Sequence, residues 1–116
     1  MKIISPKIHV VLDYLVAIFL ITAPNLIDLS ANAAIFSMVL GSIHFLLTIV
    51  TIFKGGVVKL VPFPIHGIIE LIVSITLGVL AFTIFSSHMT DHFYYAGLAV
   101  AIFLVYILTD YKSNAK

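Results

Sequence analysis

Four apolar stretches, each as long as a membrane is thick, constrain this chain more than any other feature of its sequence. A helix needs about 20 mostly apolar residues to cross the hydrocarbon core of a bilayer. Within lipid the chain must pair its own backbone polar groups, which a helix does. The stretches are Ile8–Ile27, Ala33–Phe53, Ile65–Phe85 and Phe93–Tyr111. We therefore predict an all-α integral membrane protein with four transmembrane helices, forming a single domain over residues 1–116.

The composition excludes several other classes of protein. Hydrophobic residues make up 62% of the chain and charged residues only 9%, whereas a soluble domain is about 25% charged. The chain has no arginine and a formal net charge of +1, so we expect the lipid bilayer and not nucleic acid as its partner. Cysteine is absent, which removes thiolate metal sites and disulfides. No phosphate loop, zincin motif or nucleophile elbow occurs, so we predict no catalytic residues and no enzyme activity.

The lysines predict the orientation of the four spans. They lie before the first stretch, between the second and third, and after the fourth: Lys2, Lys7, Lys54, Lys59, Lys112 and Lys116. In a four-span chain all of these positions are on one side, and lysine-rich loops stay in the cytoplasm. We therefore expect a multi-pass protein of the inner membrane with both termini cytoplasmic.

A cleaved secretory signal is the alternative interpretation of the first stretch. Lys2 and Lys7 precede an apolar run, and the small residues at 31–33 resemble a cleavage site. However, His9 and Asp13 interrupt the apolar core, and the run is longer than a signal requires. We expect the stretch to be a membrane helix.

The two halves of the chain resemble each other at a shift of 57 to 58 residues. His9 and Asp13 align with His66 and Glu70, and the segment at 51–54 aligns with the segment at 109–112. The repeat therefore covers approximately residues 5–54 and 62–112. It predicts two tandem, similarly oriented helical hairpins, related by an axis along the membrane normal.

The stretch from Ser5 to Tyr14, followed by Thr22-Ala23-Pro24-Asn25, resembles the start of a bacterial SPW-repeat membrane protein. The second half opens similarly, at residues 62–66 and Glu70. In that family each repeat is a pair of transmembrane helices with a Ser-Pro-Trp motif in the first. Here the triplet reads Ala23-Pro24-Asn25, and the second repeat has no proline at that place. The resemblance implies a small bacterial membrane protein and no particular activity.

Two His–carboxylate pairs are the first candidates for chemistry, because ionisable residues within a span are costly. His9 and Asp13 are four residues apart and share a helix face, as do His66 and Glu70. If the first and third helices are neighbours, two imidazoles and two carboxylates converge. Such a set binds a divalent metal such as Zn, Fe or Mn, or relays protons. The alternative is structural: each pair satisfies itself at a helix start.

His44 is the candidate in the second helix, near its middle. It lies on the same helix face as a stripe of small and polar residues: Ser37, Gly41, Thr48 and Thr51. Such a stripe lets membrane helices approach closely, so we expect it to face protein. His44 then serves helix packing or acts as a relay. Because we expect no other histidine at its depth, a haem would need a second chain or a different axial ligand, and haem is disfavoured.

His88, Asp91 and His92 form a second, weaker group of metal candidates at the outer surface. The two histidines are four residues apart, and Asp91 lies between them. The alternative interpretation is that Thr90 or Asp91 caps the fourth helix.

Two functions remain open from the sequence. The first is a small, non-enzymatic membrane protein whose polar cluster, near the cytoplasmic face, handles protons, ions or a divalent metal. The second is a structural or interaction subunit whose polar residues only hold helices together. In either case a bundle this small favours a homo-oligomer.

Overall fold

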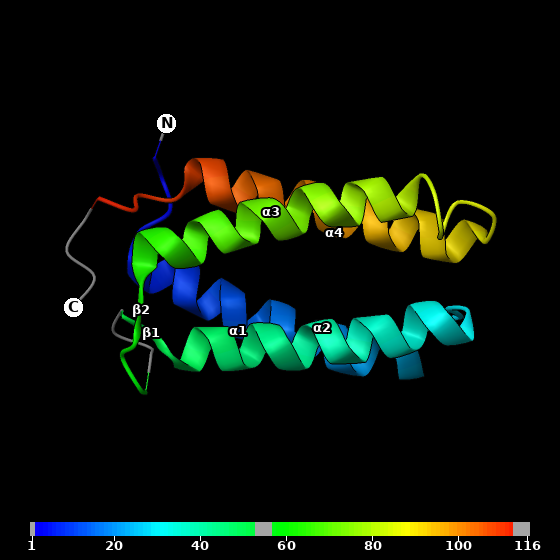
Figure 1. The fold of residues 1–116 in the computed structure, drawn as a ribbon, viewed down its shortest axis with the longest axis horizontal. Coiled ribbons are helices and arrows are strands. Elements are labelled where there is room, and N and C mark those ends of the chain that lie inside the picture. Colours follow the sequence, from blue (N-terminus) through cyan, green and yellow to red (C-terminus); the bar gives the residue numbers. More distant parts are fainter. Residues whose placement is uncertain (1, 53–56, 113–116) are drawn as a thin grey trace.

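The computed structural model describes residues 2–52 and 57–112 (Figure 1). Its α-helices are α1 (Pro6–Thr22), α2 (Ala31–Ile49), α3 (Phe63–Ala81) and α4 (Met89–Leu108). A 3-10 turn, η1 (Ala23–Asn25), follows α1, and two short strands lie between α2 and α3, β1 (Thr51–Ile52) and β2 (Val61–Pro62). Each of the four α-helices is long and apolar enough to cross a membrane, counting η1 with α1. The predicted all-helical class with four candidate spans is confirmed.

The helices begin and end earlier than the hydropathy pattern predicts, because local caps set their ends. Ser5 caps α1 and Ser30 caps α2, each by accepting a hydrogen bond from the backbone N–H three residues further on. Pro6 takes the first helical position of α1, where its missing N–H costs little. The α2 helix ends at Ile49, before the predicted end of its apolar stretch at Phe53.

The segments after α2 and α4 are extended, and each pairs with the segment that precedes a helix of the other half. Strands β1 and β2 run parallel, with Thr51 opposite Val61. In the same way Ile4 forms a parallel bridge with Thr109, and the Ile4 N–H donates to the Leu108 carbonyl at 2.9 Å. These pairings hold Thr51 beside the first turn of α3 and Thr109 beside the first turn of α1.

The helices pack as two layers. In Figure 1, α1 and α2 form the lower layer and α3 and α4 the upper one. Both described chain ends and the strands β1 and β2 lie at one end of the bundle, and the turns within each pair lie at the other. Gly41 allows the close approach of α2 to α1, because a Cβ atom there would lie 2.8 Å from the Leu20 Cβ and 3.0 Å from the Ala17 carbonyl oxygen. Ser37 donates to the Leu20 carbonyl at 2.7 Å across the same seam.

The apolar core joins the two layers at the end that holds the turns. The rings of Phe85 and Tyr95 stack with centroids 4.7 Å apart, and the Tyr95 hydroxyl donates to the Ala33 carbonyl at 2.5 Å. Large apolar side chains also cover the outside of all four helices, as Leu15 and Ile72 do with exposures of 58% and 59%. An apolar exterior of this kind suits contact with lipid.

Candidate functional site

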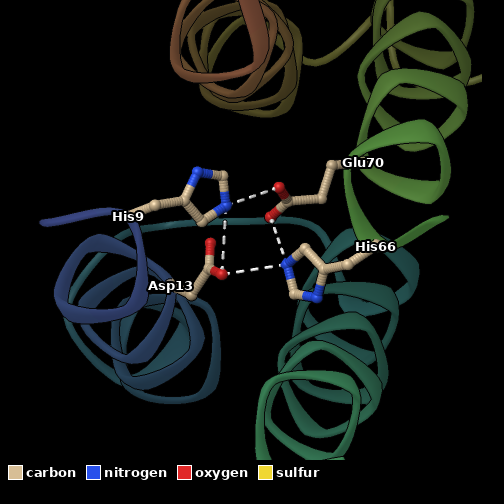
Figure 2. Close-up of side chains that lie close together, drawn as sticks. All are labelled: His9, Asp13, His66 and Glu70. Atoms are coloured by element: carbon tan, nitrogen blue, oxygen red, sulfur yellow. Dashed lines mark hydrogen bonds and ion pairs between the residues drawn. The ribbon is translucent and has the colours of Figure 1, made fainter. Parts of the chain in front are cut away.

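Two histidines and two carboxylates meet between α1 and α3, at the end of the bundle that holds the chain ends. His9 and Asp13 come from α1, and His66 and Glu70 from α3 (Figure 2). Their exposures lie between 0% and 4%, so all four are buried. The predicted convergence of the two pairs is therefore confirmed. We call these four residues the polar cluster.

The contacts of the polar cluster form a closed ring in which each imidazole contacts both carboxylates; Asp13 uses one oxygen for both histidines, and Glu70 uses one oxygen for each (Figure 2). His9 Nε2 lies 2.9 Å from Glu70 Oε1 and 3.1 Å from Asp13 Oδ2. His66 Nε2 lies 2.9 Å from Asp13 Oδ2 and 3.4 Å from Glu70 Oε2. Each histidine therefore makes its shorter contact with the carboxylate of the other helix.

A threonine hydroxyl forms a hydrogen bond with the Nδ1 atom of each of these histidines. His9 Nδ1 lies 2.8 Å from the Thr109 hydroxyl, and His66 Nδ1 lies 2.7 Å from the Thr51 hydroxyl. Each hydroxyl donates its single proton to the carbonyl four residues earlier in its own chain segment, at 2.5 Å. The hydroxyl therefore accepts from Nδ1–H, and this fixes Nε2 as the ring nitrogen that faces the carboxylates.

Sequence reasoning missed the role of these threonines. Thr51 and Thr109 are equivalent in the repeat, and that equivalence was the one signal available. Their contact with the histidines depends on the extended segments after α2 and α4, which a hydropathy pattern does not show.

His44 also reaches the polar cluster, so the expectation that no other histidine shares its depth is wrong. Its Nε2 lies 3.6 Å from Asp13 Oδ1 and 3.7 Å from Glu70 Oε2, and it has no hydrogen-bond partner. The physical reason is the early end of α2 at Ile49, which leaves His44 near the end of the helix and not at its middle. The stripe containing His44 faces protein as predicted, with Ser37, Gly41, Thr48 and Thr51 all buried.

Two aromatic rings cover the polar cluster toward the end that holds the chain ends. Phe63 and Tyr111 pack with centroids 4.8 Å apart, and both lie edge-on to the His9 ring. Tyr111 also lies over Gly67, where a Cβ atom would come within 2.5 Å of the Tyr111 ring. Burial, together with the nearby Glu70 carboxylate, raises the pKa of Tyr111, so its hydroxyl stays protonated.

His88, Asp91 and His92, the weaker group of metal candidates, form hydrogen bonds that stabilise the fold. The Asp91 carboxylate accepts hydrogen bonds from the Ser30 N–H at 2.9 Å and the Ser30 hydroxyl at 2.5 Å, which joins the N-terminus of α2 to the first turn of α4. His88 caps α4 by accepting from the Asp91 N–H, and its Nδ1 lies 3.3 Å from Asp91 Oδ1. His92 Nδ1 donates to the Ala81 carbonyl at 2.7 Å. Over residues 2–52 and 57–112, the group placed to hold an ion is the polar cluster.

Comparisons with known proteins add no relative. No family model matches the chain, and neither the curated proteins nor the solved structures contain a significant match. The chemistry of the site itself must therefore indicate the function.

Proposed function

We propose that this protein is a multi-pass protein of the bacterial inner membrane that binds one divalent transition-metal ion at the polar cluster, as a binding protein and not an enzyme. The four apolar helices support the membrane assignment. Lys2 precedes α1 and Lys7 lies in its first turn, while Lys59 lies between β1 and β2 and Lys112 follows α4. These positions support cytoplasmic termini. Lys54 and Lys116 lie outside the described residues.

The ring of nitrogen and oxygen atoms is the observation that carries the proposal. An ion with bonds of about 2.1 Å to nitrogen and oxygen places neighbouring ligand atoms about 3.0–3.4 Å apart, depending on the bond angle. Asp13 Oδ2 lies 3.1 Å from His9 Nε2 and 2.9 Å from His66 Nε2. Glu70 lies 2.9 Å from His9 Nε2 through Oε1 and 3.4 Å from His66 Nε2 through Oε2. All four ligand atoms lie within 4.8 Å of one another. The four N···O contacts therefore match the spacing of ligand atoms around Zn²⁺, Fe²⁺ or Mn²⁺.

The charge of the polar cluster supports the same proposal. With its imidazoles neutral, as metal ligation requires, and its carboxylates ionised, the polar cluster would carry two negative charges in an apolar interior. Uncompensated buried charge costs several kcal/mol per ion, even after relaxation. A divalent cation cancels both charges and bonds to all four groups. The donor set of nitrogen and oxygen suits a transition metal, since Ca²⁺ takes six to eight oxygen ligands.

Protonation of both histidines is the competing explanation, because two imidazolium–carboxylate pairs are also neutral. In that case the polar cluster holds helices together or passes protons. However, a protonated Nε2 has one hydrogen to donate, and each Nε2 lies within 3.4 Å of two carboxylate oxygens. An ion at the centre accounts for all four contacts together.

The duplicated sequence supports a site made of two equivalent halves. His9, Asp13 and Thr109 on one side correspond to His66, Glu70 and Thr51 on the other. The pairing of Ile4 with Thr109 corresponds to that of Val61 with Thr51. We include in the proposal that the chain consists of two tandem hairpins of one orientation, related to the SPW-repeat proteins that its motifs resemble.

Metal loading of the purified protein tests the proposal. We expect protein in lipid nanodiscs, loaded with Zn²⁺ and desalted, to retain about one ion per chain by mass spectrometry. Asp13→Asn and Glu70→Gln should lose the ion and keep their helical circular dichroism. Asp28→Asn, which changes an exposed carboxylate outside the polar cluster, is the matched control. If the wild type retains none of Zn²⁺, Fe²⁺ or Mn²⁺, the protonated alternative replaces the metal.

A further inference from the structure

Two small cavities border the polar cluster on its apolar side. One, of about 50 Å³, lies mainly between α1 and α4, and the other, of about 40 Å³, mainly between α2 and α3. Val16, His44, Glu70 and Ile102 line both cavities. Apart from residues of the polar cluster and His44, every lining side chain is aliphatic. Each cavity therefore connects an aliphatic surface to the proposed metal ligands.

Both cavities extend to the surface that lipid would cover. Ala101 lines the first and is exposed on α4, and Ile43 lines the second with an exposure of 57%. The opposite side of the polar cluster is covered by the rings of Phe63 and Tyr111, and the two histidines are 0% exposed. The route to the site that the structure offers thus leads from the hydrocarbon of the bilayer.

The volume of the cavities limits what they hold. A buried water occupies about 10–15 Å³ on this measure, so each cavity holds roughly three or four water-sized units. Drug-sized ligands occupy pockets of about 300–1,000 Å³, which excludes a quinone ring or a haem. Apart from the proposed metal ligands and His44, the lining is aliphatic and offers a charged molecule no partner, so the occupant is uncharged. A diatomic molecule meets both conditions.

His44 supplies the polar group beside such an occupant. It lines both cavities, and its Nε2 is buried without a hydrogen-bond partner. The distances of 3.6 and 3.7 Å to the two carboxylates are too long for hydrogen bonds. The nitrogen is therefore available to the ion or to a molecule bound on it.

We propose, building on the metal site proposed above, that the ion has an exchangeable position for one small uncharged molecule of the size of dioxygen or nitric oxide. The molecule enters from the hydrocarbon through the two cavities and binds beside His44. Such molecules dissolve in lipid, and a metal held by two imidazoles and carboxylates keeps positions open for them.

Nitric oxide on the Fe²⁺-loaded protein is the probe. Under anaerobic conditions in nanodiscs, we expect the electron paramagnetic resonance signal of an iron–nitrosyl adduct. Val16→Phe fills both cavities and should slow nitric oxide association about tenfold or more while the iron content stays constant. Leu15→Phe is the matched control, because Leu15 is the preceding residue and points outward with 58% exposure. Equal rates in the two variants would overturn the proposal.

Further measurements keep the test decisive. If Val16→Phe does not fold, Ile102→Phe replaces it, with Val100→Phe, at a position 60% exposed, as the control. Azide is a small anion, and its charge should exclude it from the cavities. Adding azide to the Co²⁺-loaded wild type at pH 8 should therefore leave the visible spectrum unchanged. An immediate spectral change would refute the proposed entry through the apolar cavities. A protein that binds iron without nitric oxide refutes this inference alone. A protein that binds no metal refutes the proposed function as well.

Discussion

The threonines behind the histidines give the sharpest test of how the site is built. Thr51→Val and Thr109→Val keep the side-chain shape and remove the hydroxyl that accepts from Nδ1–H, at 2.7 and 2.8 Å. Losing an outer partner of a metal-bound histidine typically weakens metal affinity about 10–100-fold, which corresponds to about 1.4–2.7 kcal/mol. Each variant also leaves a buried N–H unpaired, which costs about 1–3 kcal/mol of folding stability. We therefore expect both quantities to fall in both variants.

Competition for Zn²⁺ against a chromophoric chelator in nanodiscs measures the affinity, and thermal unfolding followed by circular dichroism measures the stability. Thr76→Val is the control, because its exposed hydroxyl donates only to the Ile72 carbonyl, and both quantities should stay unchanged. If Thr51→Val and Thr109→Val bind Zn²⁺ as tightly as Thr76→Val does, the threonines do not orient metal ligands. Such a result would refute the inference that these hydrogen bonds position the histidines for the metal.

Three further predictions concern packing, pH and topology. Gly41→Ala should lower the free energy of unfolding by about 1–3 kcal/mol, because the added Cβ would lie 2.8 Å from the Leu20 Cβ. Gly97→Ala is the control and should leave that free energy unchanged, because a Cβ there has no neighbour within 4 Å. Equal unfolding temperatures for the two variants would contradict the close helix contact. Metal affinity should fall as the pH is lowered, because protons compete for imidazoles that must be neutral to bind; an affinity independent of pH would exclude histidine ligands. A cysteine replacing exposed Ser87 should react with an impermeant maleimide on intact cells, and one replacing Lys59 only after permeabilisation; the reverse pattern would invert the proposed orientation.

The sequence predicts the helices and the polar cluster well because both depend on short-range spacing. Apolar runs of the right length predict each α-helix, and their errors are a few residues at the ends. The convergence of His9 with His66 is predicted from the repeat, since equivalent positions in two similar halves lie at similar depth. Four-residue spacing then places Asp13 and Glu70 on the same faces.

The features that the sequence did not predict depend on where a helix stops and on how the next segment pairs. Apolar residues continue beyond Ile49, so hydropathy extends α2 too far and places His44 too deep. Thr51 comes after the helix in an extended segment, where strand pairing decides its contacts. Likewise, the hydrogen bond between Ser30 and Asp91 joins the N-termini of α2 and α4, which are distant in sequence. No local sequence pattern indicates that these two helix ends meet.

The crossed contacts of the ring have a consequence for how such a chain is made. His9 makes its shorter contact with Glu70, and His66 with Asp13, so the first helix pair alone carries only half a ring. While a ribosome is still adding the second half, His9 and Asp13 lack Glu70 and His66 as partners, and a buried polar group without its partner costs about 1–3 kcal/mol. Arrival of α3 removes that cost. A chain truncated before α3 should thus stay recognisable to membrane proteases as unfinished, through the polar pair it cannot bury.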